Sequence, residues 1–266
     1  MAKLFGFILS RNLILWTNFR MTKSKNNLNI GVLLAAGRGE RLRPITDTTP
    51  KPLVKVFQAT LLEQNLKALS PFCDSFVIVV GWLGEKIIEQ IGSEFEGKKV
   101  TYAWQKNPKA GTLDALRTAC LEIDKNHSNY NCIVANSDEL RGSKFYQKLS
   151  IHLQKQPNKT ALAVKKETNK DKLSQFGVVL KNENGEFGQI IEKPETFVSD
   201  LINIGLYYFP AKILAQIPKN KISETKEEYI LDLLTLASSD GVFLLESDDS
   251  YLTITSPGDL AKAELK

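Results

Sequence analysis

Short apolar runs alternate with amphipathic segments through the first half of the chain. The run Ser75–Val80 (SFVIVV) is continuous and rich in β-branched residues, which is typical of a strand buried on both faces. The segment Thr112–Ile123 has apolar residues at the spacing of a helix that packs on a sheet. The pattern predicts strands at residues 30–34, 75–80, 100–104 and 132–135, and helices at 59–69, 83–91 and 112–123. Such alternation favours a parallel sheet with right-handed crossovers.

Beyond Arg141 the pattern changes to strands separated by polar turns. It predicts strands at residues 161–164, 176–180, 188–192, 202–209 and 242–245, and helices at 226–237 and 257–265. No repeat or low-complexity linker divides the chain. We therefore expect an N-terminal extension over residues 1–28 and a single domain over 29–266, with halves 29–140 and 141–266. The predicted fold class is α/β, a Rossmann-like three-layer α/β/α sandwich with a mostly parallel central sheet.

Three polar segments each follow a predicted strand. They are the glycine-containing loop after residue 34, residues 105–111, and residues 136–138. In open parallel sheets, ligands bind beyond the carboxyl ends of the strands. We therefore expect the three segments to lie along one edge of the sheet and to form a single active site.

Composition narrows the class of protein. The chain has 266 residues, of which 42% are hydrophobic and 24% charged, as in ordinary globular proteins. The net charge of +5 suits an anionic substrate, but no basic stripe interleaved with aromatic residues predicts nucleic-acid binding. The three cysteines are isolated and there are only two histidines. These counts disfavour a disulfide framework, structural zinc and histidine-based catalysis, and they favour a cytoplasmic protein.

Residues 1–20 are unusual. Their apolar positions are interrupted by Arg11 and Asn12, so no stretch is long enough to span a membrane. The apolar run at 4–9 is too short for a secretory signal, and no small-x-small cleavage pattern follows it. The absence of acidic residues before Glu40 leaves a transit peptide or a membrane-surface helix open, beside an extension outside the domain. We expect no stable membrane span.

The loop after the first strand carries candidate phosphate-binding chemistry. Residues 33–53 read LLAAGRGERLRPITDTTPKPL, in which Gly37 and Gly39 are followed by Arg41 and Lys51. Glycine lets backbone amides approach phosphate oxygens closely, and the two cationic side chains add fixed positive charge. Leu42 occupies the position where the dinucleotide-binding fingerprint needs a small residue, and the Gly-Lys-Ser/Thr ending of a P-loop is absent. The loop therefore matches neither of these two familiar phosphate-binding motifs.

The spacing Gly-x-Gly-x-Arg-Leu-x-Pro, followed by Thr46 and by Pro-Lys-Pro-Leu at 50–53, resembles the signature of a known family. That family is the nucleotidyltransferases that make nucleotide-sugars from sugar 1-phosphates and nucleoside triphosphates. The resemblance implies a nucleotide-diphospho-sugar transferase type of fold, Mg²⁺ as cofactor, and those two compounds as substrates. It also implies that the reaction is an in-line attack on the α-phosphate that releases pyrophosphate.

The same resemblance implies the residues of the site. The implied catalytic residues are Arg41, Lys51, Asp138 and Lys193, with Asp138 also the metal ligand. The implied nucleotide-binding residues are Leu34, Ala35, Ala36, Gly37, Gly39, Gln105, Gly111 and Thr112. The implied sugar-phosphate-binding residues are Gly177 of Phe-Gly-Val, Glu192 and Lys193 of Glu-Lys-Pro, and Asn203 of Asn-Ile-Gly.

The chain departs from the family pattern near its carboxyl end. Many relatives place a second metal-binding aspartate in a Trp-x-Asp-x-Gly-Thr-Pro segment, whereas residues 251–257 read YLTITSP and put Thr253 at that position. Either Asp248 or Asp249 supplies this carboxylate, or the metal relies on Asp138, phosphates and water. Mg²⁺ commonly keeps several waters and few protein ligands, so the loss of one carboxylate is tolerable. Ser137 also stands where relatives usually have glycine before the first aspartate.

Two other functions stay open at this point. The chain could be a weakly active or inactive relative that binds a nucleotide-sugar and regulates a partner, which the two departures motivate. It could also be a nucleotidyltransferase for a non-sugar phosphate acceptor, because a fold does not fix the substrate. Gln105 and Thr112 are compatible with uridine, thymidine or guanosine, of which we favour uridine. The sequence leaves a homo-oligomer open.

Overall fold

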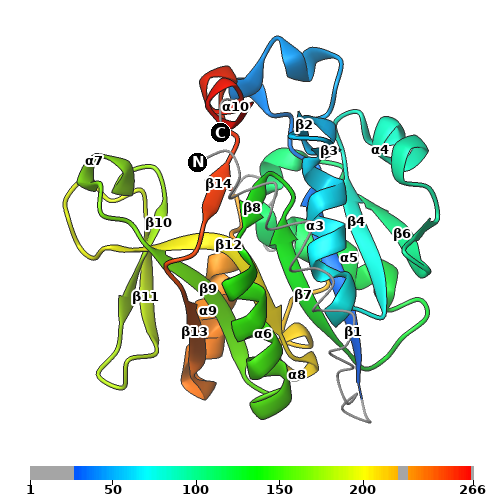
Figure 1. Ribbon diagram of the computed structural model, residues 1–266. Helices are drawn as coiled ribbons and strands as arrows, with labels where there is room; N and C mark the ends of the chain where they lie inside the picture. The colour runs from blue at the N-terminus through cyan, green and yellow to red at the C-terminus, as the bar shows by residue number, and fades with distance from the viewer. Residues whose placement is uncertain (1–26, 221–226, 265–266) are drawn as a thin grey trace.

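A single mixed sheet organises the computed structural model, which describes residues 27–220 and 227–264 (Figure 1). Within these residues the sheet has ten strands, in the order β11-β10-β12-β7-β1-β4-β6-β5, with β9 paired to β12 and β13 to β9. The strands of this sheet are β1 (Leu28–Ala35), β4 (Ser75–Val80), β5 (Glu94–Phe95), β6 (Lys98–Trp104), β7 (Tyr130–Asn136), β9 (Thr160–Lys166), β10 (Gly177–Lys181), β11 (Phe187–Glu192), β12 (Leu201–Phe209) and β13 (Val242–Glu246). Two short antiparallel pairs lie outside this sheet: β2 (Lys55–Val56) pairs with β3 (Ala59–Thr60), and β8 (Glu139–Arg141) pairs with the distant β14 (Tyr251–Thr253).

The centre of the sheet is parallel, as the sequence predicts. β1 runs parallel to both β4 and β7, and β4 runs parallel to β6. The register pairs Ala35 with Val80, Val80 with Trp104, and Leu34 with Asn136. The carboxyl ends of all four strands therefore lie at one edge, and the three polar segments expected to form the site begin there.

The second half of the chain extends this sheet with antiparallel strands. β12 pairs antiparallel with β7, β9 and β10, and β11 forms a hairpin with β10. The ladder between β12 and β9 is irregular between Asn203 and Tyr207. This irregularity lies where β12 passes the end of β7, so it adjoins the site edge.

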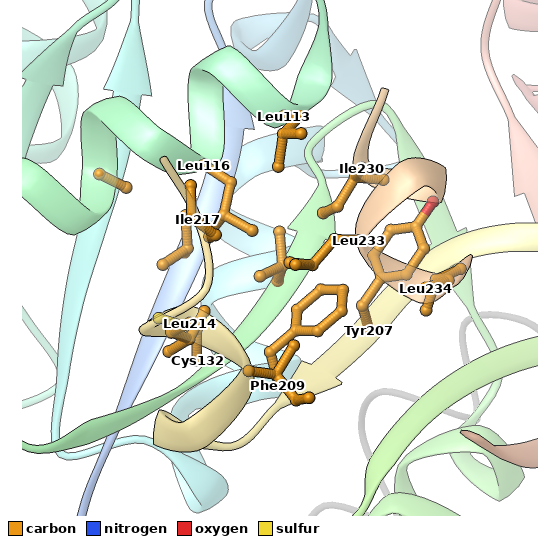
Figure 2. Packing of buried hydrophobic residues seen from close by; sticks show 14 of the residues in the cluster. Leu113, Leu116, Cys132, Tyr207, Phe209, Leu214, Ile217, Ile230, Leu233 and Leu234 are labelled. Carbon is orange, nitrogen blue, oxygen red and sulfur yellow. The ribbon is translucent and has the colours of Figure 1, made fainter. Parts of the chain in front are cut away.

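Helices cover both faces of the sheet and produce the predicted three layers. The helices are α3 (Leu61–Leu69), α4 (Gly84–Ile91), α5 (Thr112–Ile123), α6 (Ser143–Lys155), α7 (Lys170–Leu173), α8 (Ala211–Leu214), α9 (Ile230–Ala237) and α10 (Pro257–Glu264). Val32 points into the cluster formed with α5, α8 and α9, whereas its neighbour Leu33 points into the cluster formed with α3, α4 and α6. Figure 2 shows the first cluster, in which Leu116, Leu233 and Phe209 meet between the helices and the sheet. The predicted fold class is thus confirmed.

A smaller apolar cluster joins the end of the chain to the loop that follows β1 (residues 37–53), called the signature loop below. Its buried members are Leu42, Val54, Val56, Leu61, Ile254 and Ala263. Figure 1 accordingly shows α10 and β14 beside the loop that follows β1. The carboxyl-terminal segment therefore packs against the loop that follows β1, at the site edge of the sheet.

Two predicted helices start later than the apolar pattern indicates. The helix predicted from residue 59 begins at Leu61, because Ala59 and Thr60 pair with β2 and the Thr60 side chain caps the first turn. The helix predicted from residue 226 begins at Ile230, because the main chain of Glu228 bonds instead to Ala110 and Leu113. The start of the second prediction, residue 226, lies outside the described residues.

The helices and the cysteines bear on the expectations about membrane spans and disulfides. None of the helices in the described ranges is long and apolar enough to cross a membrane. Cys73, Cys120 and Cys132 are buried free thiols, and burial raises the pKa of Cys132. The unusual residues 1–20 lie outside the part of the chain that the structure describes.

Candidate active site

The signature loop is held in one conformation by its own side chains. Gly39 has φ +63°, and a Cβ there would lie 3.0 Å from Thr46 Cγ2 and 3.1 Å from Lys51 Cβ. The Thr46 hydroxyl donates to the Gly39 carbonyl oxygen at 2.8 Å, and Trp82 Nε1 donates to the Thr46 carbonyl oxygen at 3.1 Å. Glycine is the residue that this left-handed turn favours. The loop therefore folds back so that Lys51 lies against the turn at Gly39.

Lys51 and Asp138 meet at the carboxyl ends of β1 and β7. The Lys51 ammonium forms an ion pair with the Asp138 carboxylate, whose side chain is 33% exposed against 12% for Lys51. Ser137, which precedes this aspartate, donates its hydroxyl to the Leu34 carbonyl oxygen at 2.6 Å. Two residues that are 87 positions apart thus share one partly open site. The Leu34 end of β1 is fixed to this site by Ser137, where relatives usually have glycine.

The other predicted site residues of this segment differ in how exposed they are. Gly37 is exposed, and a Cβ placed on it would meet no atom within 4 Å. Arg41 is exposed in a 3₁₀ turn, and it makes no ion pair or hydrogen bond with any residue in ranges 27–220 and 227–264. Arg38 instead lies over the Trp82 ring, 5.1 Å from its centroid. Ala35 and Ala36 are buried at the end of β1. The structure therefore leaves open space over the glycine turn and does not bring Arg41 into contact with Lys51 or Asp138.

The loop at 105–112 is fixed by close packing against residues 228–230. Gly111 has φ +96°, and a Cβ there would overlap the Glu228 carbonyl oxygen. Glu228 N donates to the Ala110 carbonyl oxygen at 2.9 Å, and Ile230 N donates to the Thr112 hydroxyl at 2.9 Å. Gln105 is buried, and its backbone nitrogen donates to the Val80 carbonyl oxygen at 2.9 Å. The expected base-binding segment thus lies at the same sheet edge as the signature loop.

The expected sugar-phosphate segment gathers at the end of the β10–β11 hairpin. Gly177 pairs with Glu192, and a Cβ on this glycine would lie 2.8 Å from Glu192 Oε2. Lys193 has φ +47°, donates its backbone N–H to the Phe176 carbonyl oxygen at 3.0 Å, and carries an exposed side chain 3.9 Å from Glu192. Partial burial raises the pKa of Glu192, the Lys193 charge opposes the rise, and the Glu227 charge adds to it. Glu227 in turn adjoins Gly111, where a Cβ would lie 2.9 Å from Glu227 Cγ.

A buried ionic cluster that the sequence analysis missed joins the acidic segment to β12. Arg141 donates to Glu139 Oε2 at 2.8 Å and to the carbonyl oxygens of Ile204 at 2.6 Å and Gly205 at 2.7 Å. The Tyr251 hydroxyl donates to Glu139 Oε1 at 2.8 Å. Burial raises the pKa of Glu139, and the Arg141 charge opposes that rise. No motif marks these residues, but a charged residue directly after a predicted site aspartate was a usable signal.

Asn203 adjoins this cluster. Its side-chain oxygen accepts from the Gly205 backbone nitrogen at 2.9 Å, and its Nδ2 donates to the Tyr207 hydroxyl at 2.8 Å. Gly205 has φ +59°, and a Cβ there would lie 2.3 Å from Asn136 Nδ2. The absent side chain lets β12 approach the end of β7 closely. The predicted sugar-binding strand therefore lies beside the segment that carries Asp138.

The residues at the predicted metal position supply one carboxylate, that of Asp138, which is paired with Lys51. The β8–β14 ladder places Thr253 opposite Glu139, and Ile254 N donates to the Asp138 carbonyl oxygen at 3.3 Å. Asp249 instead accepts from Lys144 N at 2.8 Å, and Asp248 is exposed and pairs with Lys144 at 3.1 Å. Both of these aspartates lie beyond the other end of that ladder, so neither replaces the missing carboxylate.

The donor set at Asp138 fits a cation that is held mostly by substrate and water. In the described residues, no group of three or more His, Cys, Asp or Glu side chains is arranged to hold a metal ion. A single partly exposed carboxylate is a usual protein contribution to a Mg²⁺ site that is completed by phosphate oxygens and waters. It is not a site for a tightly held structural metal.

The geometry defines an α/β protein with a cationic and acidic site at the carboxyl ends of its parallel strands, where such folds bind nucleotides. A family model described as nucleotidyl transferase matches residues 30–250. The match covers most of the chain, including the loop after β1, residues 105–112, the segment with Asp138 and the β10–β11 hairpin, and it ends just before β14. The chain therefore belongs to the nucleotidyl transferase family.

Several relatives are similar over most of this chain. The UTP–glucose-1-phosphate uridylyltransferase AglF of Haloferax volcanii is 31% identical over 242 residues, which are 88% of this chain and 94% of that protein. The mannose-1-phosphate guanylyltransferase catalytic subunit beta of Drosophila melanogaster is 31% identical over 201 residues, 74% of this chain and 53% of that protein. The bifunctional protein GlmU of Methanocaldococcus jannaschii is 30% identical over 203 residues, 76% and 45%. The chain thus spans about half the length of the last two relatives.

Solved structures share the same fold. A UDP-glucose pyrophosphorylase complexed with UDP-glucose matches with a TM-score of 0.77 at 21% identity, over 90% of this chain and 97% of that one. A UDP-glucose pyrophosphorylase from Acinetobacter baumannii matches with a TM-score of 0.73 at 21% identity, over 90% and 92%. At these identities the likeness concerns the fold alone.

Proposed function

We propose that this chain joins a sugar 1-phosphate to a nucleoside triphosphate, releasing pyrophosphate and forming a nucleotide-sugar. An oxygen of the sugar 1-phosphate forms the new bond to the α-phosphorus, and the bond from that phosphorus to the pyrophosphate oxygen breaks. The observation that carries the proposal is the Lys51–Asp138 pair, which joins the glycine loop to the acidic strand end. The uridylyltransferase and guanylyltransferase relatives support the same reaction class.

The proposed roles follow from the need to hold two polyanions together. The glycine-turn amides, with Arg41 and Lys51, would bind the triphosphate and offset the charge that develops during transfer. The exposed Arg41 side chain is able to turn toward a ligand over Gly37. Asp138 would hold Mg²⁺, which supplies charge stabilisation at the phosphates when it is bound. Thr253, opposite Glu139, adds no charge to that site.

The acceptor would bind from the second half of the chain. Lys193 would hold the phosphate of the sugar 1-phosphate, and Glu192 and Asn203 would accept or donate hydrogen bonds to sugar hydroxyls. Gly177 would give the sugar room beside Glu192. This division corresponds to a nucleotide-binding half at 29–140 and a sugar-phosphate-binding half at 141–266 within one domain. We infer a cytoplasmic enzyme whose partners are small molecules.

The base would lie against the loop at 105–112. Gln105, Gly111 and Thr112 are its proposed contacts, and the end of β1 at Leu34, Ala35 and Ala36 would lie against the nucleoside. Uridine is the proposed base, since the relative covered over nearly its whole length is a uridylyltransferase. Thymidine and guanosine fit the same kind of contact.

A panel assay tests the proposal. Pyrophosphate release is measured with each common nucleoside triphosphate, a set of hexose 1-phosphates and Mg²⁺, for the unmodified chain and for Asp138→Ala. We expect turnover with at least one pair and a loss on the order of a hundredfold or more in the variant, as removal of metal-based charge stabilisation produces. Unchanged Mg²⁺-dependent release in Asp138→Ala would contradict its assignment.

A binding protein that regulates a partner is the second candidate. The observation that favours it is the replacement of one metal carboxylate by Thr253, with Asp248 and Asp249 both engaged by Lys144 instead. In that case calorimetry would detect nucleotide-sugar binding while no pair in the panel released pyrophosphate. Release with a phosphate acceptor other than a sugar would instead identify a different acceptor class.

A further inference from the structure

The amide of Gln105 has an orientation that its surroundings force. Gln105 is 5% exposed, and its Nε2 donates to the Gly111 carbonyl oxygen and to Asp114 Oδ2, each at 3.0 Å. Both partners offer only acceptor atoms, a carbonyl oxygen and a carboxylate oxygen. The nitrogen must therefore face them, because the reversed amide would place its oxygen against two acceptors. Both N–H groups of Gln105 are used, and its carbonyl oxygen faces the other way.

A buried ion cluster behind the loop maintains this orientation. Arg117 Nη1 donates to Asp114 Oδ1 at 2.9 Å and to Glu228 Oε2 at 2.8 Å, and Arg117 Nε donates to the Pro218 carbonyl oxygen at 2.7 Å. The side chains of Arg117 and Glu228 are 4% and 6% exposed. Arginine has donors and no acceptor, so Asp114 Oδ1 must accept from it, which leaves Asp114 Oδ2 toward Gln105. Asp114 therefore accepts from Arg117 on one carboxylate oxygen and from Gln105 on the other.

We infer that Asp114 and Arg117 are positioning residues that fix Gln105 as an acceptor-only group for the base. This inference rests on the proposed function, since it requires a nucleobase beside the loop at 105–112. A carbonyl oxygen accepts the ring N–H of uracil, thymine or guanine. It repels the bare ring nitrogen that cytosine and adenine have at the corresponding edge. The substrate class is therefore a nucleoside triphosphate whose base carries a ring N–H.

The inference is tested first on the unmodified chain. Pyrophosphate release and calorimetric binding are measured with UTP, dTTP, GTP, CTP and ATP, and with the N-methylated form of the preferred nucleotide (N3-methyl-UTP or N1-methyl-GTP). We expect kcat/KM about tenfold or more lower for CTP, ATP and the methylated form, as for one mismatched hydrogen bond. Equal use of CTP or ATP, or of the methylated nucleotide, would overturn the inference.

Asp114→Asn then tests the positioning role. Arg117 keeps an acceptor if the new amide turns its oxygen toward the guanidinium, and this places the new Nδ2 against Gln105. A reversed Gln105 amide would then accept from the new Nδ2 but would still set its oxygen against the Gly111 carbonyl oxygen, so Gln105 loses its single forced orientation and its N–H groups reach the base part of the time. We expect the ratio of kcat/KM for CTP to that for the preferred nucleotide to rise about tenfold, mainly through KM. Arg117 is left in place, so the variant keeps the buried cation paired with Glu228.

Asp124→Asn is the matched control. It makes the same change at the other end of α5, where Asp124 bonds to the Tyr130 hydroxyl at 2.9 Å and to Lys219 at 3.2 Å. We expect no change in nucleotide preference in this variant. In a Gln105→Ala background, Asp114→Asn should also leave the preference unchanged, because the group that it orients is gone.

The outcomes separate this inference from the proposed function. No pyrophosphate release with any pair of substrates would count against the proposed function itself. Turnover with an unchanged preference in Asp114→Asn, or an equal shift in Asp124→Asn, would overturn only the positioning role. Should Asp114→Asn fail to fold, the comparison of methylated and unmethylated nucleotides on the unmodified chain still tests recognition of the ring N–H, and loss of that discrimination in Gln105→Ala would assign it to Gln105.

Discussion

Gly111→Ala is the sharpest perturbation of the site that the backbone geometry offers. Gly111 has φ +96° and ψ −179°, a region that is essentially restricted to glycine and costs other residues about 1–3 kcal/mol. A methyl group there would also overlap the Glu228 carbonyl oxygen and lie 2.9 Å from Glu227 Cγ. Forcing extra volume into a packed position costs about 1–3 kcal/mol more. We therefore expect Gly111→Ala to lower the free energy of unfolding by about 4 kcal/mol.

Two other glycines separate these contributions. Gly92 has a closely similar backbone, with φ +74° and ψ −159°, but a Cβ there meets nothing within 4 Å. Gly92→Ala therefore reports the backbone cost alone, about 2 kcal/mol. Gly37 has neither a left-handed φ nor a neighbour within 4 Å, so Gly37→Ala should change stability by less than about 0.5 kcal/mol.

Urea unfolding followed by tryptophan fluorescence at pH 7 measures all three variants. Gly111→Ala should also weaken nucleotide binding, because the Gly111 carbonyl oxygen holds the Gln105 amide. Gly37→Ala should weaken triphosphate binding at nearly unchanged stability, because the space over that residue is the proposed phosphate site. If Gly111→Ala were no more destabilising than Gly92→Ala, the close packing of the loop on residues 227–230 would be refuted.

Three further predictions concern separate parts of the site and fold. Lys193→Ala should raise the KM for sugar 1-phosphate while leaving triphosphate affinity unchanged by calorimetry; the opposite split would reverse the proposed roles of Lys193 and Lys51. Arg141→Met should lower the free energy of unfolding in urea by about 3–5 kcal/mol, because it leaves a buried carboxylate unpaired. Arg43→Met, at an exposed pair, should cost less than about 1 kcal/mol, and equal costs would refute the distinction. Burial lowers the pKa of His152, so the unfolded chain binds more protons and stability should fall as pH drops below about 6.5. Urea unfolding of His152→Leu between pH 7.5 and 5.5 should lack this part of the pH dependence, and an unchanged slope would exclude His152 as its source.

The elements that the sequence predicts best are those whose periodicity is set by burial in the sheet. Ser75–Val80 and Thr112–Ile123 have the same bounds in the structure as in the prediction. Periodicity is a weaker guide where the main chain has another partner. The helix over residues 230–237 starts late for this reason, since Glu228 bonds to the loop at 105–112, which is more than a hundred residues away in sequence. The helix Ser143–Lys155 has apolar spacing at its buried face but a polar composition, and it was not predicted.

The residues of the site also fall into those that the sequence predicts and those that depend on long-range packing. The strand-end rule correctly places the glycine loop, Gln105 and Asp138 at one edge, because parallel strands align their carboxyl ends whatever lies between them. The rule does not identify the cluster of Arg141 and Glu139, nor that of Arg117 and Glu228. Those contacts depend on how distant segments pack, and a single sequence carries no spacing signal for them. The position of Glu139 directly after Asp138 hinted at one of them, but the partners of both clusters follow only from the folded structure.

The Lys51–Asp138 pair has a consequence for how the proposed site would load its substrates. In the absence of ligand, the Asp138 carboxylate is neutralised by the Lys51 ammonium, and the register of β14 supplies no second carboxylate opposite it. A divalent cation arriving alone would have to displace that ammonium and would gain only one charged ligand. A triphosphate offers Lys51 competing oxygens and brings its own oxygens for the cation, so it removes the obstacle and completes the coordination at once. If the site works as proposed, with Thr253 in place of a second carboxylate, cation binding would depend more on the nucleotide than on the protein, and the two would have to arrive together.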